Sequence, residues 1–181
     1  MRELNAFQYN MIFTELADAV GYGNVSTKEV DRLVYAVDHW WGPEMWLDKG
    51  RKPPEPDFVV HPETPEAVAA VLRTANTYRI PVIPWAGSSG SQGGALPVFG
   101  GIVMDVKKLD RIIEINEASL TVTAQAGING QKLESALNEK GLTLAHYPAA
   151  QKGSTLGGYL APRGSGTLST KYGKAEDMVM S

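Results

Sequence analysis

The sequence predicts an α+β fold with a mixed sheet, and three features of the chain carry that prediction. Segments with apolar residues at helical spacing alternate with short apolar runs that are typical of strands. Few of these segments follow one another as strict strand–helix–strand repeats, so a purely parallel sheet is not expected. Two glycine-rich loops each follow an apolar run, and the stretches 87–101 and 153–173 hold six glycines apiece out of 19.

Residues 1–53 are predicted to form a helical arm that ends in a linker. Apolar positions at helical spacing predict a first helix over 7–20. Ser26 and Glu29 fit a capping box that would open a second helix. The prolines within 49–57 exclude a helix there, so we interpret that segment as the linker.

The apolar residues of the arm leave two roles open. The second helix would carry an apolar stripe of four residues: Val30, Leu33, Val34 and Val37. Three tryptophans follow it: Trp40, Trp41 and Trp46. These rings either pack the arm on a larger body or form part of a substrate or partner surface.

The body of the protein is predicted to begin at residue 54. Six short apolar runs predict strands, at 58–60, 80–84, 101–106, 112–115, 120–126 and 142–144. Thr64 followed by Pro65 predicts the start of a helix, as N-cap and first helical residue. Asn129 is predicted to cap another helix that runs through Lys140 and stops at Gly141.

Composition excludes several classes of function. A net charge of −3 disfavours a broad nucleic-acid-binding surface. The absence of cysteine excludes disulfides, thiolate metal sites and a cysteine nucleophile. His39, His61 and His146 lie far apart, so no metal site is predicted. No apolar run reaches the ~20 residues that span a bilayer, and no signal-like segment is evident, so we expect a cytoplasmic protein without a transmembrane segment.

The first glycine-rich loop, residues 84–94, predicts an anion site. Glycine lets backbone amides approach a ligand closely, and successive amides form an anion-binding concavity. The serines of this loop add hydroxyl donors. Its spacing matches neither the dinucleotide fingerprint nor the Walker loop. With the second loop, it suggests one extended ligand that carries a diphosphate.

The second loop, residues 153–166, holds the other candidate ligand contacts. Ser154 and Thr155 precede a predicted short helix whose N-terminal amides would face an anion. Arg163 is expected either to contact the ligand or to form a surface salt bridge. His146, just before the loop, is expected to be structural or to face the ligand. Glu176 and Asp177 are predicted to lie on a strand and to point to opposite faces, which excludes an acid–base pair.

These motifs resemble the FAD-binding domain of the vanillyl-alcohol-oxidase family, the PCMH-type domain. The resemblance rests on blocks at 56–60, 65–68, 84–90, 154–158, 162–165, 171–173 and 176–179. It covers about 54–181 and implies two α+β lobes with mixed sheets that hold FAD between them. It also implies that the C-terminal part of the domain, and a cap that covers the substrate, lie outside this chain.

The resemblance assigns FAD contacts to both loops. On the first loop they are Pro84, Trp85, Ala86, Gly87, Ser88, Ser89, Gly90, Ser91, Gly93 and Gly94. On and beside the second they are Ala149, Gly153, Ser154, Thr155, Gly157, Gly158, Pro162, Arg163, Gly164 and Ser165. Covalent members of the family attach flavin through a histidine in or near the first loop. That loop has no histidine here, so non-covalent FAD is expected.

Two groups within the family are similar to this chain. The glycolate/D-lactate dehydrogenases imply oxidation of a small 2-hydroxy acid by hydride transfer to the flavin. The alkyldihydroxyacetone-phosphate synthases, which 154–179 resembles most, imply flavin chemistry without net redox. A non-catalytic FAD-binding or electron-transfer subunit, completed by a partner chain with the cap, is a further alternative. No catalytic residue is assigned, because those of the family would lie in the cap. A small-molecule kinase is disfavoured, since the first loop has no lysine.

Overall fold

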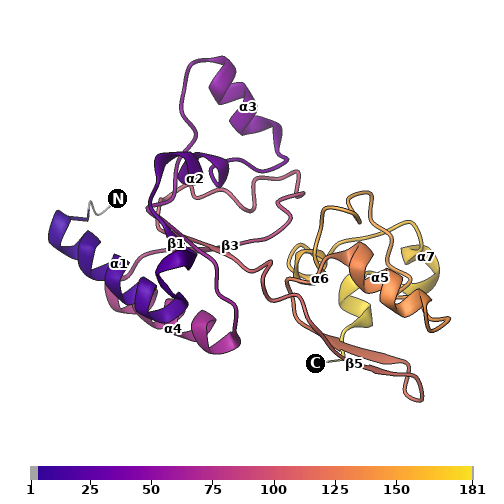
Figure 1. Ribbon diagram of the computed structural model, residues 1–181. Coiled ribbons are helices and arrows are strands. Elements are labelled where there is room, and N and C mark those ends of the chain that lie inside the picture. Colours follow the sequence, from indigo (N-terminus) through magenta and orange to yellow (C-terminus); the bar gives the residue numbers. More distant parts are fainter. Residues whose placement is uncertain (1–3, 181) are drawn as a thin grey trace. The chain divides into compact units, whose positions relative to one another are not determined.

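The computed structural model describes residues 4–180 and divides the chain into two compact units (Figure 1). The first unit comprises the chain up to Trp85 together with Gly90–Val106. The second comprises Ala86–Ser89 and the chain from Lys107 onward. The middle of the first glycine-rich loop therefore belongs to the second unit, whereas both flanks of the loop belong to the first.

The first unit is built on a four-stranded sheet in the order β1-β2-β4-β3. Its strands are β1 (Val25–Ser26), β2 (Phe58–Val60), β3 (Val82–Trp85) and β4 (Ile102–Asp105). Both β2 and β3 pair with β4 in parallel, and β1 pairs with β2 antiparallel. The predicted mixed sheet is thus confirmed.

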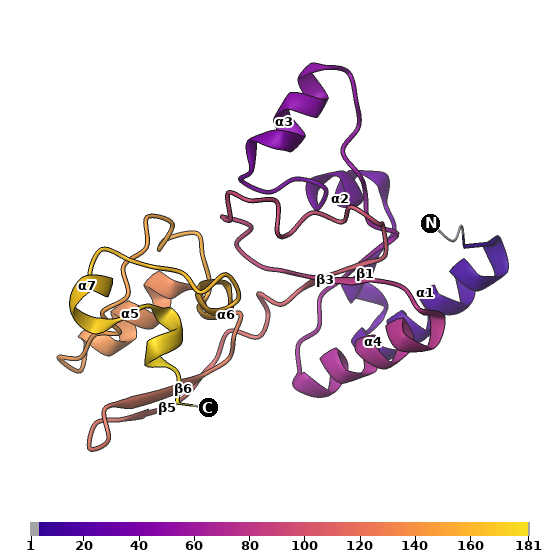
Figure 2. The same cartoon turned by 180° about the vertical axis from the view of Figure 1, so that it is seen from behind.

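Two helices of the first unit, α1 (Ala6–Val20) and α4 (Pro65–Tyr78), lie side by side in both views (Figure 2). The N-cap of α1 is Asn5, which forms a complete capping box with the residue three positions on. Thr64 caps α4 as predicted, because its side-chain oxygen accepts from the Ala67 amide at 3.2 Å.

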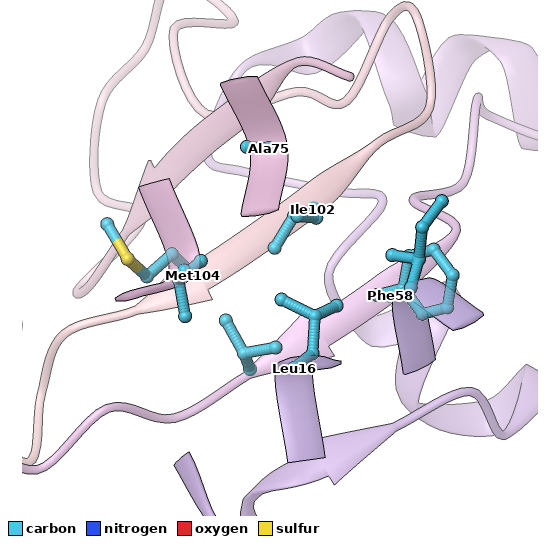
Figure 3. Packing of buried hydrophobic residues seen from close by; sticks show 8 residues of the cluster. Leu16, Phe58, Ala75, Ile102 and Met104 are labelled. Atoms are coloured by element: carbon cyan, nitrogen blue, oxygen red, sulfur yellow. The ribbon is translucent and has the colours of Figure 1, made fainter. Parts of the chain in front are cut away.

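The core of the first unit lies between these helices and the sheet (Figure 3). Leu16 of α1 and Ala75 of α4 meet side chains of the two inner strands. Every residue of β2 and of β4 is buried, as expected for inner strands of a parallel arrangement that is covered on both faces. The fully buried core members include Ile12, Leu16, Phe58, Val60, Val71 and Ile102.

The rest of the arm differs from the prediction in two respects. Helix α2 (Glu29–Val34) begins after Lys28, and the Ser26 hydroxyl instead donates to the Asp31 carboxylate at 2.5 Å. The predicted capping box is therefore wrong. The predicted apolar stripe is largely exposed, with Val30 at 65% and Val34 at 56%. The tryptophans belong to a helix that was not predicted, α3 (Trp41–Asp48), and to its N-cap.

The second unit contains a two-stranded hairpin and small helical elements. The elements are β5 (Ile112–Asn116), β6 (Thr121–Ala124), α5 (Gly130–Asn138), α6 (Leu156–Leu160), α7 (Ser169–Tyr172) and the 3₁₀ helix η2 (Ala175–Met178). Ile128, Leu133 and Leu137 form its buried core, against which apolar residues of the hairpin pack. Asn129 caps α5 as predicted, accepting from the amides of Gln131 and Lys132.

Two predicted strands of the second unit are wrong. Residues 142–144 form no strand, because this segment donates hydrogen bonds to the buried carboxylate of Glu134 on α5 instead of to a neighbouring strand. It accepts from the Thr143 hydroxyl at 2.6 Å and from the Leu144 amide at 3.0 Å. Glu176 and Asp177 lie on η2, where the Asp177 carboxylate accepts from the Lys174 amide at 2.8 Å.

Within residues 4–180, no helix has the length and apolarity to cross a membrane.

Candidate cofactor-binding site

The first glycine-rich loop leaves the sheet at the carboxyl end of β3. Trp85, the last residue of β3, pairs with Asp105, the last residue of β4, and the Trp85 carbonyl accepts from the Val106 amide at 3.0 Å. None of the amides from Ala86 to Gln92 donates a hydrogen bond within residues 4–180. Residues 86–92 are half-exposed or exposed, so these donors are open to solvent and available to an anionic ligand.

Gly87 brings the two glycine-rich loops together inside the second unit. A Cβ atom on Gly87 would overlap the carbonyl oxygen of Gly153 and would lie 2.9 Å from the Cα atom of Ser154. Only glycine fits at this position, because the obstacle is backbone. The next residue, Ser88, has a left-handed φ of 43°. A non-glycine residue in this region stores strain of about 1–3 kcal/mol, and such strain concentrates at ligand-binding sites.

The second loop, by contrast, is hydrogen-bonded internally. The Ser154 hydroxyl donates to the Ala150 carbonyl at 2.6 Å, and the Thr155 hydroxyl accepts from the Gly158 amide at 3.2 Å. The amides of Leu156 and Gly157 donate to carbonyls of the segment before α5. The short helix α6 forms as predicted, but its first amides are engaged and do not face an anion. The second loop therefore supports the first loop through the contact of Gly153 with Gly87.

The remaining predicted contacts of the second loop lie mostly at the surface. Ala149, Gly153, Gly158, Pro162 and Ser165 are exposed, whereas Ser154 and Thr155 are buried. A contact of these residues with FAD stays a prediction. The exposed ones have space for a ligand, and the two buried hydroxyls are already engaged.

Arg163 forms the surface salt bridge that was one of its two expected roles. Its side chain is 75% exposed and donates to both carboxylate oxygens of Glu176, at 2.6 and 3.0 Å. Hydrogen bonding by Arg163 holds the pKa of the Glu176 carboxyl below its usual range. The backbone of Arg163 is left-handed, with φ 58°. The pair anchors the second loop to η2. A flavin contact by Arg163 stays a prediction.

His146 is packed inside the second unit. Its side chain is 2% exposed and meets the ring of Tyr159 edge to face, with 4.7 Å between centroids. Neither imidazole nitrogen, nor the Tyr159 hydroxyl, has a hydrogen-bond partner in the part of the chain that the structure describes. Burial lowers the pKa of the His146 imidazole, so the ring is neutral in the folded protein. The structural role expected for His146 is the one observed.

Three residues around the first loop, Tyr35, His61 and Asp105, were not predicted from the sequence to lie there, whereas packing on the body was one of the two roles expected for Trp40. The Tyr35 hydroxyl donates to the Asp105 carboxylate at 2.6 Å, and the Tyr35 ring packs against Trp85. His61 lies 3.7 Å from the same carboxylate, and the Trp40 ring lies against Gly93. Burial, followed by the hydrogen bond to Asp105, raises the pKa of Tyr35. The sequence offered one signal for this group of residues: an acidic residue, Asp105, directly follows the apolar run 102–104.

Together, a mixed sheet and a loop of unused amides at its carboxyl edge define a domain that binds an anionic cofactor. The chain belongs to the FAD binding domain family, which matches residues 56–181. Its cofactor is FAD. Among residues 4–180, no cluster of three histidine, aspartate or glutamate side chains is placed to hold a metal ion.

Similar proteins include flavoenzymes of two kinds. An alkyldihydroxyacetonephosphate synthase from Caenorhabditis elegans is 39% identical over 154 residues, which are 82% of this chain and 26% of that protein. The glycolate oxidase subunit GlcD from Bacillus subtilis is 30% identical over 166 residues, 92% of this chain and 33% of that protein. The chain spans about a quarter to a third of the length of these relatives.

Solved structures show the same fold. A structure of alkyldihydroxyacetonephosphate synthase matches 94% of this chain and 35% of its own, with a TM-score of 0.86 and 29% identity. The structure of p-cresol methylhydroxylase with bound substrate matches 90% of this chain and 31% of its own, with a TM-score of 0.74 and 19% identity. The PCMH-type fold predicted from the sequence is confirmed.

The residues present fit the diphosphate of FAD. Its two phosphates carry negative charge, and the amides from Ala86 to Gln92 offer uncharged donors without internal partners. The strained backbone at Ser88 and the obligatory glycine at 87 indicate a loop held in one shape. A phosphate site of this kind needs no lysine.

We predict that alanine destabilises the protein at one of the two contacting glycines, Gly87, but not at the other, Gly153. Gly87→Ala forces a methyl group into the Gly153 carbonyl and should lower the free energy of unfolding by about 1–3 kcal/mol. Gly153→Ala is the matched control, because its nearest neighbour would lie 3.9 Å away, and it should change stability by no more than about 0.5 kcal/mol. Chemical denaturation measures both. Equal stability of the two variants would contradict the close approach.

We also predict that His146 makes stability depend on pH. The pKa of His146 is lower in the folded protein than the unfolded value of about 6.5, so the unfolded state binds more protons as the pH falls. Stability should therefore drop from about pH 7 to about pH 5, by at most about 1.4 kcal/mol per pH unit for this group. His146→Phe fills similar space without nitrogens and should flatten the profile. If denaturant titrations gave parallel profiles of stability against pH for wild type and His146→Phe, the predicted role of His146 would be refuted.

Proposed function

We propose that this chain holds FAD non-covalently, with the diphosphate on the amides of Ala86–Gln92. In this proposal the chain is the cofactor-binding part of a flavoenzyme that oxidises a small 2-hydroxy acid. The run of unused donors on the first loop is the observation that carries the cofactor site. A cap that covers the substrate would be supplied by other parts of the same protein or by a partner subunit.

Each feature of the first loop has a role in this proposal. The amides bind the phosphate oxygens, and glycine at 90 leaves space for the ligand, since no described atom lies within 4 Å of a Cβ there. Gly87, seated on Gly153, keeps the middle of the loop in place. FAD itself supplies the electron acceptor, and the protein positions it.

The relatives support two candidate reactions, the first of which is the oxidation of a 2-hydroxy acid. GlcD of Bacillus subtilis and a mitochondrial D-lactate dehydrogenase from Arabidopsis thaliana, 32% identical over 126 residues, support a 2-hydroxy acid. The second candidate is the formation of an alkyl ether of dihydroxyacetone phosphate. It is favoured by the 39% identity to the synthase from Caenorhabditis elegans and by the TM-score of 0.86 to a synthase structure.

Gly90→Ala tests the cofactor site. Nothing in the described chain opposes a methyl group at this position, so the free energy of unfolding should stay within about 0.5 kcal/mol of wild type. The methyl group would occupy space that the diphosphate needs, and we expect the Kd for FAD to rise about tenfold or more. Gly23→Ala is the control, since it is equally unobstructed and lies in a short 3₁₀ helix, Tyr22–Asn24, outside both glycine-rich loops. An unchanged Kd in a titration of Gly90→Ala would place the diphosphate elsewhere.

The substrate is tested on the full-length protein that carries this chain, reconstituted with FAD. Glycolate and D-lactate are each added without oxygen, and the flavin absorbance is followed. Bleaching by either acid supports the proposed oxidation. No bleaching by either acid, together with formation of an alkyl ether of dihydroxyacetone phosphate, would reject it in favour of the second candidate.

A further inference from the structure

We propose that the N-terminal arm is part of the cofactor site, because Tyr35 and Trp40 position the two ends of the first glycine-rich loop. Both residues lie outside the region 56–181 that matches the FAD binding domain family. Both belong to the first unit, as do the two loop flanks that they contact. The inference concerns positioning residues, and it rests on the proposed diphosphate site at Ala86–Gln92.

Tyr35 fixes the start of the loop. Its ring lies edge to face on the indole of Trp85, with 4.6 Å between centroids and an interplanar angle of 64°. Its hydroxyl donates to the Asp105 carboxylate at 2.6 Å, and Asp105 is only 2% exposed. Because Trp85 and Asp105 pair across the two parallel strands, one tyrosine holds the ends of both. A hydrogen bond to a buried carboxylate is among the stronger ones in proteins.

Trp40 fixes the far end of the loop. A Cβ atom on Gly93 would lie 3.1 Å from Cε3 of the Trp40 ring, so the indole rests directly on the backbone of the loop. Gly93 also has a left-handed φ of 73°, which favours glycine. The indole also covers Gly42, where a Cβ atom would overlap the ring, and it meets Trp46 edge to face. The half-buried indole thus contacts both α3 and the loop.

Fixed ends matter because the donors between them have no partners of their own. A flexible loop of unpaired amides would lose conformational entropy each time that it closed on a diphosphate. Anchors at Trp85 and Gly93 reduce that loss by fixing the two flanks of the loop that belong to the first unit before the ligand arrives. The arm, which the sequence predicts either to pack on the body or to form part of a substrate or partner surface, therefore acts on cofactor affinity.

The test compares neighbouring tryptophans. Trp40→Leu removes the ring that contacts Gly93. Trp41→Leu removes the neighbouring ring, which is 61% exposed and lies against Trp40 with 5.7 Å between centroids. Tyr35→Phe keeps the contact with Trp85 and removes only the hydrogen bond to Asp105. Affinity for FAD and for ADP, which shares the diphosphate, is measured on apoprotein well below its unfolding temperature, together with the unfolding temperature itself.

We expect Kd to rise roughly fivefold or more for Trp40→Leu, and by the same factor for FAD and ADP. Trp40→Phe should recover part of the loss. Trp41→Leu, which leaves the Trp40 ring in place, should lose clearly less affinity than Trp40→Leu. Tyr35→Phe should also weaken binding, and it decides the question if Trp40→Leu does not fold. Wild-type affinity in both Trp40→Leu and Tyr35→Phe, or a loss for FAD without a loss for ADP, would overturn the inference alone. A wild-type protein that binds neither ligand would overturn the proposed function together with it.

Discussion

The contact between the backbones of Gly87 and Gly153 is the constraint on which the cofactor site depends. It holds the middle of the first glycine-rich loop in the second unit, while β3 and the loop flanks belong to the first. The requirement for glycine at 87 is imposed by the protein itself, since a carbonyl oxygen occupies the space. At Gly90 the protein imposes no such limit. Two glycines three residues apart therefore differ: Gly87 is required for packing, whereas Gly90 faces open space, where we propose that the ligand binds.

The two glycine-rich loops differ in how many of their hydrogen-bond donors are free. The second loop has few free donors, because its hydroxyls and the first amides of α6 are hydrogen-bonded internally. The first loop keeps its amides free and leaves from the carboxyl end of a parallel strand, where ligands bind in many sheets of this kind. The hydrogen-bonded second loop supports the first loop, whose amides are open to solvent and can meet an anion.

Local signals in the sequence predicted most of the fold. The caps Thr64 and Asn129, and the apolar spacing of the helices that they start, depend only on neighbouring residues, and the structure confirms them. The strand expected at 142–144 failed because Glu134, on a different element, takes the hydrogen bonds of that segment. The apolar stripe on α2 was expected to be buried but is exposed. The reason is similar, because spacing shows which residues share a face of a helix but not what covers that face.

The site itself was predictable in its location but not in its supports. Glycine spacing indicated both loops, whereas the pairing of Tyr35 with Asp105 joins residues 70 positions apart and has no local signature. The central claim is that the free amides of the first loop bind the diphosphate. Heteronuclear NMR of the backbone amides, with and without FAD, tests it most directly. The account predicts the largest shifts and slowed hydrogen exchange at Ala86–Gln92. Unshifted resonances there, with perturbations confined to other segments, would contradict it.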